Sequence, residues 1–334
     1  MAIFFNARLR KLRESMNSAG LSNVLLTSAN DIYYYTGFRV SDGDSFLRVG
    51  VGSRPVLFVS PLENEASELR TAEVRFIRKL RELELPKTIG FDEHSMTAAV
   101  YEKLKRLSRL QPAAAAIKKP RMVKDSHELG QIRKAVAVTA KALESLSLAG
   151  RKELDVAKSI DIGFMEREAD NAFDTIVASG RNAAFVHHRP GAKKIGVKEL
   201  VIIDLGARFR GYCADVSRTL CQRPGRKEKG LIEGISRMQS EIMDYIEPGK
   251  TMKELNSIYE KLMKKEGYRV MHGFGHGVGL NVHEMISGEL EKNMVITVEP
   301  GAYVKGFGGC RIEDMLLLGK KNRLLTKKIK QPFH

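Results

Sequence analysis

Apolar positions in the first 120 residues follow two alternating periodicities, and each change marks an expected element. Residues 5–19 repeat apolar side chains at helical spacing, and Gly20 then predicts the C-terminal end of that helix. The β-rich runs at 46–52 and 55–60 predict a hairpin. Further short apolar runs predict strands at 23–27, 74–77, 88–91 and 113–117. Strands that alternate with helices predict a layered α/β domain over residues 1–120.

A second domain is expected to follow a polar junction. Residues 117–124 are basic and interrupted by a proline, which predicts a domain boundary there and a second domain over residues 121–334. Asp125 and Glu128 have the spacing of a capping box and predict the start of a long helix. A second capping box predicts another helix over residues 251–265.

The composition is that of a globular protein with about two domains. The 334 residues are 43% hydrophobic and 29% charged, which is too apolar for a disordered chain. No run approaches the roughly 18 uncharged apolar residues of a membrane span, so we expect no membrane partner. The N-terminal residues lack the pattern of a secretory signal, which predicts a cytoplasmic protein. Cys213, Cys221 and Cys310 lack metal-site spacing and are expected to be small buried hydrophobes.

The net charge of +16 raises the question of a nucleic-acid partner. The excess is spread evenly, because residues 1–120 carry 19 basic and 13 acidic side chains and the remainder carries 37 and 27. Neither domain is selectively basic, and we expect no nucleic-acid partner. A group of cations near the C-terminus faces no acidic residue and is expected to form a solvated tail: Lys320, Lys321, Arg323, Lys327, Lys328 and Lys330.

Two aspartates lie on a predicted hairpin in the second domain. Residues 201–204 form an apolar run that ends in Asp204, and residues 212–215 return to Asp215. Pairing of these two segments would bring both carboxylates to one place. Like charges at such a distance require a cation between them. An aspartate pair alone is more often part of a turn or a sheet edge, so the hairpin becomes a candidate metal site only together with the segments that follow.

Histidines concentrate in the same half of the chain. His272, His276 and His283 stand among glycines in residues 271–284, and five of the eight histidines lie between His187 and His283. This concentration is not that of scattered surface residues and indicates a functional site. The alternating glycines of this segment predict that two backbones approach closely within a strand or at a bulge.

Two further carboxylates stand in strand-like apolar runs. Glu299 follows the apolar residues 295–298, and Glu313 precedes the apolar residues 315–318. A carboxylate in such a run requires a cationic partner, which adds both residues to the candidate site.

These residues and their neighbours resemble the pita-bread metallopeptidases, the family of methionine aminopeptidase, aminopeptidase P and prolidase. The shared motifs are His-x-x-x-His-Gly-x-Gly, Val-Glu-Pro-Gly and Arg-Ile-Glu-Asp. Residues 30–37 resemble the N-terminal domain that prolidase and aminopeptidase P have and methionine aminopeptidases lack. The resemblance implies a creatinase-like α/β domain over residues 1–120 and a pita-bread catalytic domain over residues 121–334. It also implies five metal ligands: Asp204, Asp215, His276, Glu299 and Glu313.

The ligand set itself restricts the choice of metal. Four carboxylates and one neutral imidazole carry a charge of −4, which two divalent cations would cancel. Oxygen ligands with one nitrogen and no thiolate suit Mn²⁺, Co²⁺, Zn²⁺ or Fe²⁺, and the excess of carboxylates favours Mn²⁺. We therefore expect two divalent ions per chain, Mn²⁺ or Co²⁺, with Zn²⁺ or Fe²⁺ as alternatives.

The resemblance implies a role for each ligand. Asp215 and Glu313 bridge the two ions, Asp204 chelates one, and His276 with Glu299 completes the other. Two ions roughly 3.5 Å apart can hold a bridging hydroxide, which attacks the peptide bond at neutral pH.

Three other histidines are implied at the active site by the same resemblance. His283 hydrogen-bonds the substrate carbonyl oxygen as it becomes an oxyanion. His272 lies beside the S1′ pocket, and His187 contacts the P1′ side of the scissile bond. His188 is expected at the surface or behind the site.

The resemblance also assigns two charged side chains to supporting roles. Glu299 resembles the proton shuttle of the family, in addition to its role as a ligand. Arg311 is expected to orient Asp215 or Glu313 from behind the metal ligands.

The expected activity is hydrolysis of the Xaa-Pro bond of dipeptides, that of a prolidase, by a chain that forms a homodimer as family members often do. Aminopeptidase P, which acts on longer peptides, is the alternative, because Ser287 replaces the arginine with which many prolidases pair the dipeptide carboxylate. Arg181 is a candidate substitute for that arginine. A non-enzymatic pita-bread binding module with a vestigial metal site is a further alternative, against which the complete ligand set argues.

Overall fold

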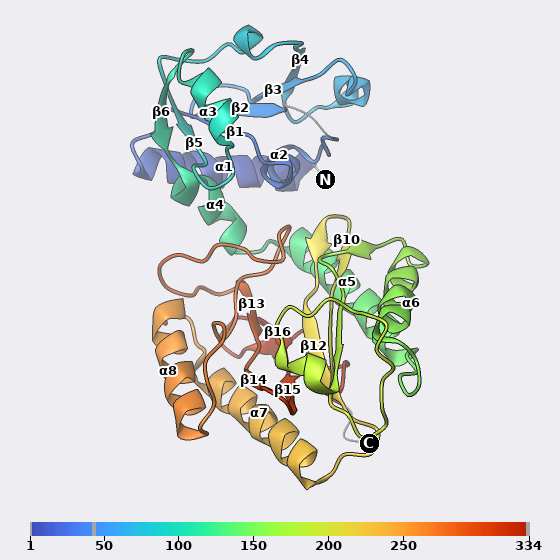
Figure 1. Ribbon diagram of the computed structural model, residues 1–334. Helices are drawn as coiled ribbons and strands as arrows, with labels where there is room; N and C mark the ends of the chain where they lie inside the picture. Colours follow the sequence, from blue (N-terminus) through green and yellow to red (C-terminus); the bar gives the residue numbers. More distant parts are fainter. Residues whose placement is uncertain (1, 42–44, 332–334) are drawn as a thin grey trace. The chain divides into compact units, whose positions relative to one another are not determined.

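The computed structural model describes residues 2–41 and 45–331, and the chain divides into two compact units, Met1–Arg121 and Met122–His334 (Figure 1). The N-terminal unit is built on a six-stranded mixed sheet. Its helices and strands are α1 (Ala2–Ser18), β1 (Asn23–Leu26), α2 (Ala29–Thr36), β2 (Phe46–Gly50), β3 (Val56–Val59), β4 (Glu73–Phe76), β5 (Thr88–Phe91), α3 (Ala98–Leu104), β6 (Arg109–Pro112) and α4 (Ala114–Met122). Two short 3₁₀ helices, Asn64–Glu68 and Leu80–Glu82, connect β3 to β4 and β4 to β5.

The sheet of this unit has the order β4-β3-β2-β1-β5-β6. The hairpin expected from the two β-rich runs is confirmed, because β2 pairs antiparallel with β3. Helix α1 ends near Gly20, whose φ of +67° is the left-handed conformation that glycine adopts at a helix end. Apolar side chains from β1, β2, β3 and β5 pack into a buried core with Leu104.

The expectation of a strand at residues 113–117 was wrong, because these residues begin helix α4. Consecutive alanines favour a helix, and the Glu93 carboxylate accepts hydrogen bonds from the backbone amides of Ala113 (3.0 Å) and Ala114 (2.9 Å). The strand instead precedes this run and ends at Pro112. The basic segment expected to hold the domain junction is helical up to Met122, with Pro120 inside the helix.

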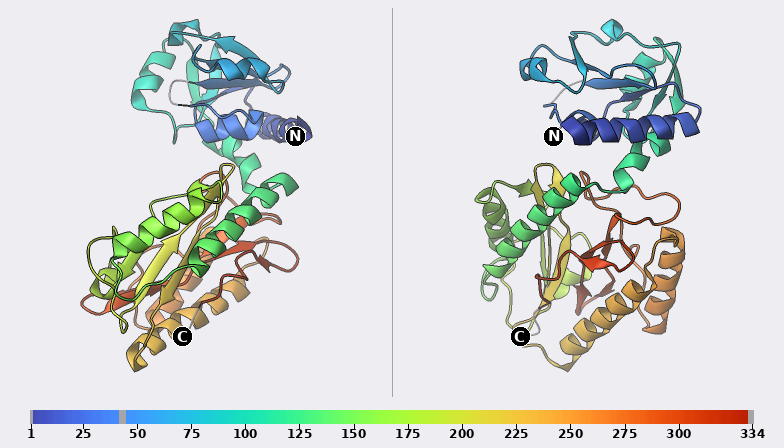
Figure 2. Two further views of the ribbon diagram at one scale, coloured as in Figure 1. Left: turned by 90° about the vertical axis from the view of Figure 1, so that its right-hand side faces the viewer. Right: turned by 180° about the vertical axis from the view of Figure 1, so that it is seen from behind.

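The C-terminal unit places strands between two pairs of helices. Its elements are α5 (Ser126–Glu144), α6 (Glu153–Met165), β7 (Asp170–Asn171), β8 (Ile176–Ser179), a 3₁₀ helix η3 (Gly180–Ala184), β9 (Val201–Leu205), β10 (Ala207–Phe209), β11 (Tyr212–Cys213), β12 (Val216–Leu220), α7 (Arg226–Tyr245), α8 (Met252–Lys265), β13 (Val295–Val298), β14 (Gly301–Val304), β15 (Gly308–Arg311), β16 (Asp314–Leu317) and β17 (Arg323–Leu324). Helices α5 and α6 cover one side of the strands, and α7 and α8 cover the other (Figures 1 and 2). This arrangement is a mixed α/β fold in which the helices cover the two sides of the strands, so that the strand ends are available for a functional site.

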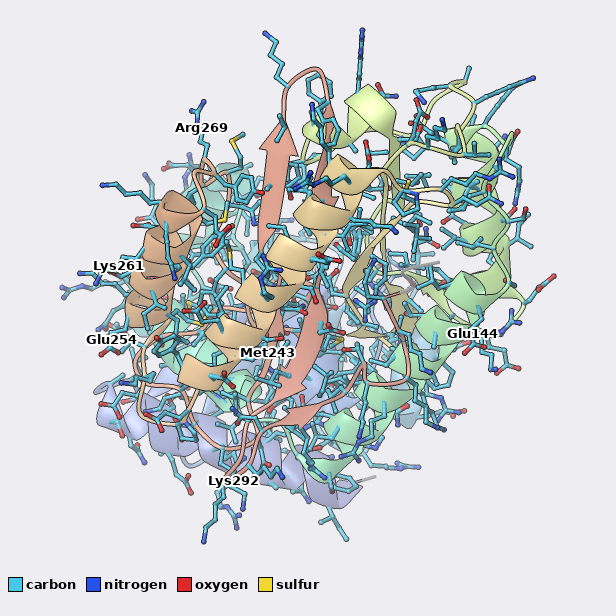
Figure 3. All side chains as sticks on the ribbon, turned by 90° about the horizontal axis from the view of Figure 1, so that it is seen from below. Glu144, Met243, Glu254, Lys261, Arg269 and Lys292 are labelled. Carbon is cyan, nitrogen blue, oxygen red and sulfur yellow. The ribbon has the colours of Figure 1, made fainter. Side chains whose placement is uncertain are left out.

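Both capping boxes are confirmed. Asp125 and Glu128 cap α5, and Thr251 and Glu254 cap α8, each with the reciprocal pair of side-chain to backbone hydrogen bonds. Helix α8 is amphipathic: Figure 3 shows Lys261 pointing outward from it, whereas its buried residues join the core beneath the sheet. The local sequence therefore determines where these helices begin and which face they bury.

The hairpin expected around the two aspartates is also confirmed. Strand β9 pairs antiparallel with β12, and Asp204 stands opposite Ser217. Strands β10 and β11 continue the same hairpin to a turn at Arg210 and Gly211, whose φ values of 47° and 87° match a tight hairpin turn.

The basic segment near the C-terminus is more firmly held than a solvated tail. Its six cationic side chains are exposed, as expected. The backbone between them is not free, because the buried Arg218 guanidinium donates hydrogen bonds to the carbonyls of Ile329 and Lys330. The side chain of Gln331 also hydrogen-bonds the backbone of Thr219. Sequence composition could not indicate this docking, since the partners lie on a distant strand.

Two expectations from composition concern burial. All three cysteines are buried free thiols, which confirms their reading as small hydrophobes. Within the described part of the chain, no helix has the length and apolar character that a membrane crossing requires.

Candidate active site

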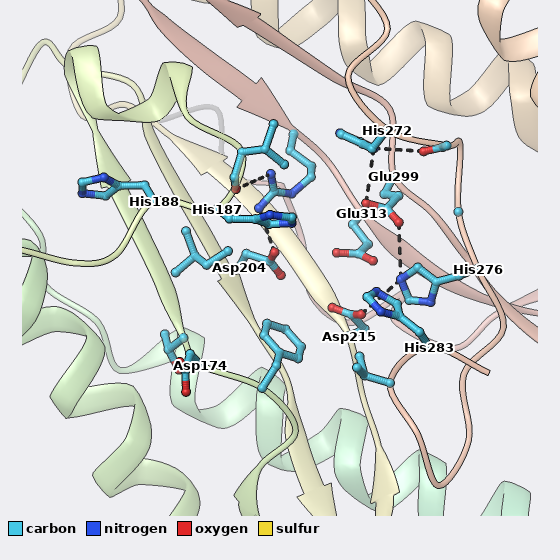
Figure 4. Close-up of a pocket in the computed structure, with 18 of the residues that line it drawn as sticks. Asp174, His187, His188, Asp204, Asp215, His272, His276, His283, Glu299 and Glu313 are labelled. Atoms are coloured by element: carbon cyan, nitrogen blue, oxygen red, sulfur yellow. Dashed lines mark hydrogen bonds and ion pairs between the residues drawn. The ribbon is translucent and has the colours of Figure 1, made fainter. Parts of the chain in front are cut away.

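The candidate residues of the C-terminal unit line one cavity of about 660 Å³. Figure 4 shows the carboxylates and imidazoles facing a common space, with His188 further away. The expected residues that line the cavity are His187, Asp204, Asp215, His272, His276, His283, Glu299, Arg311 and Glu313. Segments more than a hundred residues apart in the sequence therefore contribute to a single site.

Strand register brings the acidic residues together. Glu299 follows the last residue of β13 and Glu313 precedes the first residue of β16, and these strands pair with Val298 opposite Asp314. The two glutamates consequently lie next to each other at one end of this pair. Asp204 and Asp215 come from the β9–β12 hairpin in the same way.

The shortest separations join His276 to the carboxylates. Its Nε2 lies 3.5 Å from Oδ2 of Asp215 and 3.3 Å from Oε1 of Glu299. One ligand atom from each of Asp215, His276 and Glu313 can be chosen so that all three lie within 4.8 Å of one another. Such a group could hold a metal ion.

The tautomer of His276 suits a metal ligand. Its Nδ1 lies 3.1 Å from the carbonyl oxygen of Gly277, which can only accept a hydrogen bond, so Nδ1 carries the proton. The lone pair of Nε2 is then directed toward the carboxylates. Burial also lowers the pKa of His276 to about 4, with His283 adding to the effect, so the imidazole is neutral at pH 7.

Burial without a cation is unfavourable for the carboxylates. Desolvation and the neighbouring carboxylates raise the pKa values of Asp215 and Glu313 well above their usual range. Burial likewise raises the pKa of Glu299 to about 8. The Oδ1 atom of Asp204 is buried and has no hydrogen-bond partner among the described residues. Hard divalent cations would relieve all of these costs, so the donor set fits such ions.

Arg311 does not contact the carboxylates that the sequence analysis assigned to it. Its Nη2 pairs with Oδ2 of Asp204 at 2.7 Å, whereas Asp215 and Glu313 are not its hydrogen-bond partners. It reaches Glu313 indirectly, because its Nε donates to Oγ of Ser217 and that hydroxyl donates to Oε2 of Glu313. Arg311 is the last residue of β15, opposite Gly301 of β14, and β15 packs against β9, the strand that carries Asp204.

The remaining histidines occupy different parts of the cavity. The His283 ring packs edge-on against His276 with 4.1 Å between centroids. His272 donates from Nδ1 to the carbonyl of Gly273 and accepts at Nε2 from the Tyr303 hydroxyl at 2.8 Å. His187 lines the cavity next to these groups. Its neighbour His188 instead bonds a buried carboxylate, that of Glu153, at 2.9 Å.

Several supporting side chains were not found from the sequence. Tyr303 accepts a hydrogen bond from Arg311 at 2.7 Å and donates to His272, and Ser217 joins Arg311 to Glu313. Neither residue belongs to a recognisable motif, so no sequence signal identified them.

Arg181, the carboxylate partner suggested from the sequence, lies elsewhere, and so does Ser287, which replaces the arginine of many prolidases. Ser287 and Arg181 are both exposed, and neither lines the cavity. Arg189 does line it. The choice of Arg181 relied on nearness in sequence to His187, which does not indicate the direction of a side chain.

The alternating glycines do permit close backbone approach, but they are not in a strand. A side chain at Gly275 would collide with the backbone oxygen of Thr297. Gly277 makes only isolated bridges, to Glu284 and Ile296. The segment is thus a loop laid against β13, which fixes the position of His276.

A mixed α/β unit with buried carboxylates around a neutral imidazole defines a metal-dependent hydrolase. The chain belongs to metallopeptidase family M24, whose model matches residues 130–320. The model of the creatinase/prolidase N-terminal domain matches residues 8–123. Each of the two units therefore matches a family model, and the expected family is confirmed.

Similar proteins cover the chain almost completely. The Xaa-Pro dipeptidase of Pyrococcus horikoshii is 33% identical over 345 aligned residues, which cover 96% of this chain and 97% of the relative. The crystal structure of the prolidase from Pyrococcus horikoshii OT3 matches with a TM-score of 0.88 at 31% identity, over 96% of this chain and 98% of that one. The X-Pro aminopeptidase structure from Thermotoga maritima matches with a TM-score of 0.84 at 26% identity, over 95% and 97%.

Proposed function

We propose that this chain hydrolyses the Xaa-Pro bond of dipeptides with two divalent metal ions. The observation that carries the proposal is the buried cluster of carboxylates around Nε2 of His276 in the cavity. Similarity along nearly the whole chain to proteins named Xaa-Pro dipeptidase and prolidase supports the substrate class. Mn²⁺ and Co²⁺ are the proposed ions, with Zn²⁺ or Fe²⁺ as alternatives, because oxygen ligands dominate the set.

The five cavity residues would divide the ions between them. Asp215 and Glu313 are proposed as the shared ligands, since they are the most deeply buried of the four carboxylates and form with His276 a group whose ligand atoms lie within 4.8 Å of one another. Asp204 would hold one ion through its unpartnered Oδ1, and His276 with Glu299 would hold the other. Bound ions of this kind polarise the scissile carbonyl and make water a better nucleophile at neutral pH.

Other side chains would orient the reacting groups. His283 faces the cavity beside His276 and is the proposed donor to the carbonyl oxygen as negative charge develops on it. Glu299 is proposed to carry the proton toward the leaving nitrogen. Arg311 would hold Asp204 in place directly and Glu313 through Ser217. His187 and His272 are proposed to contact the proline side of the bond.

Three further properties belong to the same proposal. We propose a domain boundary near residue 120, a homodimeric state and a cytoplasmic location. Size-exclusion chromatography with light scattering would measure the oligomeric state.

The test measures activity and metal content on the same preparations. Met-Pro should be cleaved after loading with Mn²⁺ or Co²⁺, and the reversed dipeptide Pro-Met should not. Asp215→Asn and Glu313→Gln should abolish activity and lower the metal content, because each would remove a shared ligand. Glu260→Gln is the matched control, since Glu260 is an exposed carboxylate on α8. Full activity with two ions per chain in either ligand variant would contradict the assignment.

An Xaa-Pro aminopeptidase acting on longer peptides is the second candidate. It is favoured by the position of Ser287 outside the cavity and by the similarity to the Thermotoga maritima enzyme. The kcat/KM values for Met-Pro and Met-Pro-Ala distinguish the two. A preference of about tenfold or more for the tripeptide would select the aminopeptidase.

A further inference from the structure

We propose that Arg189 binds the free carboxylate of the substrate and thereby confers the preference for dipeptides. The inference rests on the proposed Xaa-Pro hydrolysis and names the residue that recognises the C-terminal end of the substrate. No motif of the sequence analysis indicated this residue.

A dipeptide brings its own carboxylate into the acidic cavity. The carboxyl carbon lies one residue beyond the scissile carbonyl, at most about 4 Å away. It must therefore occupy the same cavity as five carboxylates, those of the metal cluster and Asp174. A carboxylate desolvated there without a positive partner would bind poorly, so a nearby cation is required.

Among the described residues, Arg189 and Arg311 are the two arginines that line the cavity, and no lysine lines it. The Arg311 guanidinium is committed to Asp204, Ser217 and Tyr303, and its side chain is only 3% exposed. Arg189 is an exposed residue, and no carboxylate of the described residues forms an ion pair with it within 4 Å. Arg189 is therefore the arginine of the cavity that remains available to a ligand.

The backbone that carries Arg189 is held in place from behind. The fully buried Glu153 carboxylate bonds Nε2 of His188 at 2.9 Å and the backbone amide of Gly191 at 3.3 Å. Arg189 lies between these two anchors, and His187 precedes them on the cavity wall. The same carboxylate also accepts hydrogen bonds from Ser179. The backbone at Arg189 is thus fixed before a ligand binds, and the side chain is free to reach the ligand. Because the backbone is already ordered, less conformational entropy is lost on binding.

The chemistry of the guanidinium explains a preference for dipeptides. It can donate two parallel hydrogen bonds to one carboxylate, which an amide cannot accept in the same charge-assisted way. In a tripeptide the carboxylate lies about 3.5 Å further along the chain, and a neutral peptide group takes its place. The interaction is made equally in the bound substrate and in the transition state, so its loss should appear mainly in KM.

The test is a cycle of two substrates and three proteins, to which the conservative variant Arg189→Lys is added. Met-Pro and its C-terminal amide are compared on wild type, Arg189→Gln and Arg181→Gln. Arg181→Gln is the matched control, because Arg181 is an exposed arginine of the preceding helix η3 that does not line the cavity. Amidation should lower kcat/KM of the wild type and of the control by on the order of thirtyfold. Arg189→Gln should lose a similar factor on Met-Pro, mainly through KM, and should show little further loss on amidation. Arg189→Lys should recover part of the discrimination, because it keeps the charge but not the paired donors.

Two controls separate this inference from the proposed function. Circular dichroism and metal content should match wild type in all variants, because Arg189 contacts no ligand of the cluster in the described residues. Binding of the product L-proline against L-prolinamide, measured by calorimetry, should show the same dependence on Arg189 without any turnover. An amidation penalty that persists in Arg189→Gln, or a wild type indifferent to amidation, would overturn the role of Arg189. Failure to cleave any Xaa-Pro peptide would instead overturn the proposed function, and the calorimetric comparison would still decide the role of Arg189.

Discussion

The metal-free protein should lose stability as the pH rises from 6.5 to 8. Burial raises the pKa of Glu299 from 4.5 to about 8 in the folded chain, so the folded state keeps a proton that the unfolded state has already released. The unfolded state therefore binds fewer protons in this range, and the free energy of unfolding falls as the pH rises. One proton over 1.5 pH units is worth about 2 kcal/mol. Asp215 and Glu313 have pKa values raised in the same direction and add to the fall.

The histidines determine the lower limit, pH 6.5, of the range in which stability should fall. Burial lowers the pKa of His276 from 6.5 to about 4, so the unfolded state binds the extra proton between these values. That difference makes the free energy of unfolding rise with pH below 6.5, opposite in sign to the effect of Glu299. His272 and His283 have pKa values lowered in the same direction. Above pH 6.5 the histidine contributions are complete, and the carboxylates determine the slope.

The perturbation is Glu299→Gln, which keeps the shape of the side chain and removes its titration. The protein is first freed of metal with a chelator and then unfolded in urea. Unfolding is followed by far-UV circular dichroism, because the chain has no tryptophan whose fluorescence could report it. The variant should have a shallower dependence on pH than wild type, by about 1.4 kcal/mol per pH unit. Glu260→Gln, on the exposed face of α8, should leave the slope unchanged. Saturating Mn²⁺ should remove the downward slope of the wild type, since its ligands bind deprotonated.

A wild-type stability that is constant or rising between pH 6.5 and pH 8 without metal would refute this reasoning. So would a slope in Glu299→Gln equal to that of wild type. Either result would mean that the cavity is hydrated enough to keep Glu299 ionised, and burial would then not be the reason that the cluster requires cations.

Two other substitutions test the oxyanion donor and the backbone beside it. His283→Ala should lower kcat by on the order of a hundredfold to a thousandfold with unchanged metal content, and loss of metal together with activity would show that His283 is a ligand. Gly275→Ala should lower the free energy of unfolding by on the order of 3 kcal/mol, because the new methyl group would meet the Thr297 backbone oxygen. Gly230→Ala has open space around the added carbon and should not, as thermal unfolding would show.

Elements with a local signal could be predicted from the sequence. Capping boxes at Asp125 and Thr251 contain all the groups that they need within four residues, so they identify the starts of α5 and α8. Residues 113–117 could not be assigned in this way, because the carboxylate that caps α4 belongs to Glu93, about twenty positions earlier. Apolar content alone does not distinguish a strand from a buried helix in so short a run.

The same distinction between local and distant signals applies to the candidate site. Its members could be named from motifs, because the family resemblance concerns residue types in order along the chain. The contacts of Arg311 could not, since they depend on which strands face β15: the sequence analysis expected Asp215 or Glu313, whereas Arg311 pairs with Asp204 and reaches Glu313 only through Ser217. The choice between Arg181 and Arg189 depends likewise on the course of the loop around Glu153, an anchor that precedes His188 by 35 residues.

The arrangement separates chemistry from specificity. The proposed ligands lie at strand ends whose register is set by the pairings of β9 with β12 and of β13 with β16, so a change there alters the whole cluster. Arg189 lies on a loop that Glu153 holds to the rest of the unit, and Arg311 donates a hydrogen bond of 3.4 Å to the Val186 carbonyl of the same loop. Substitutions in that loop can therefore change which end of a peptide is recognised while the carboxylates keep their positions.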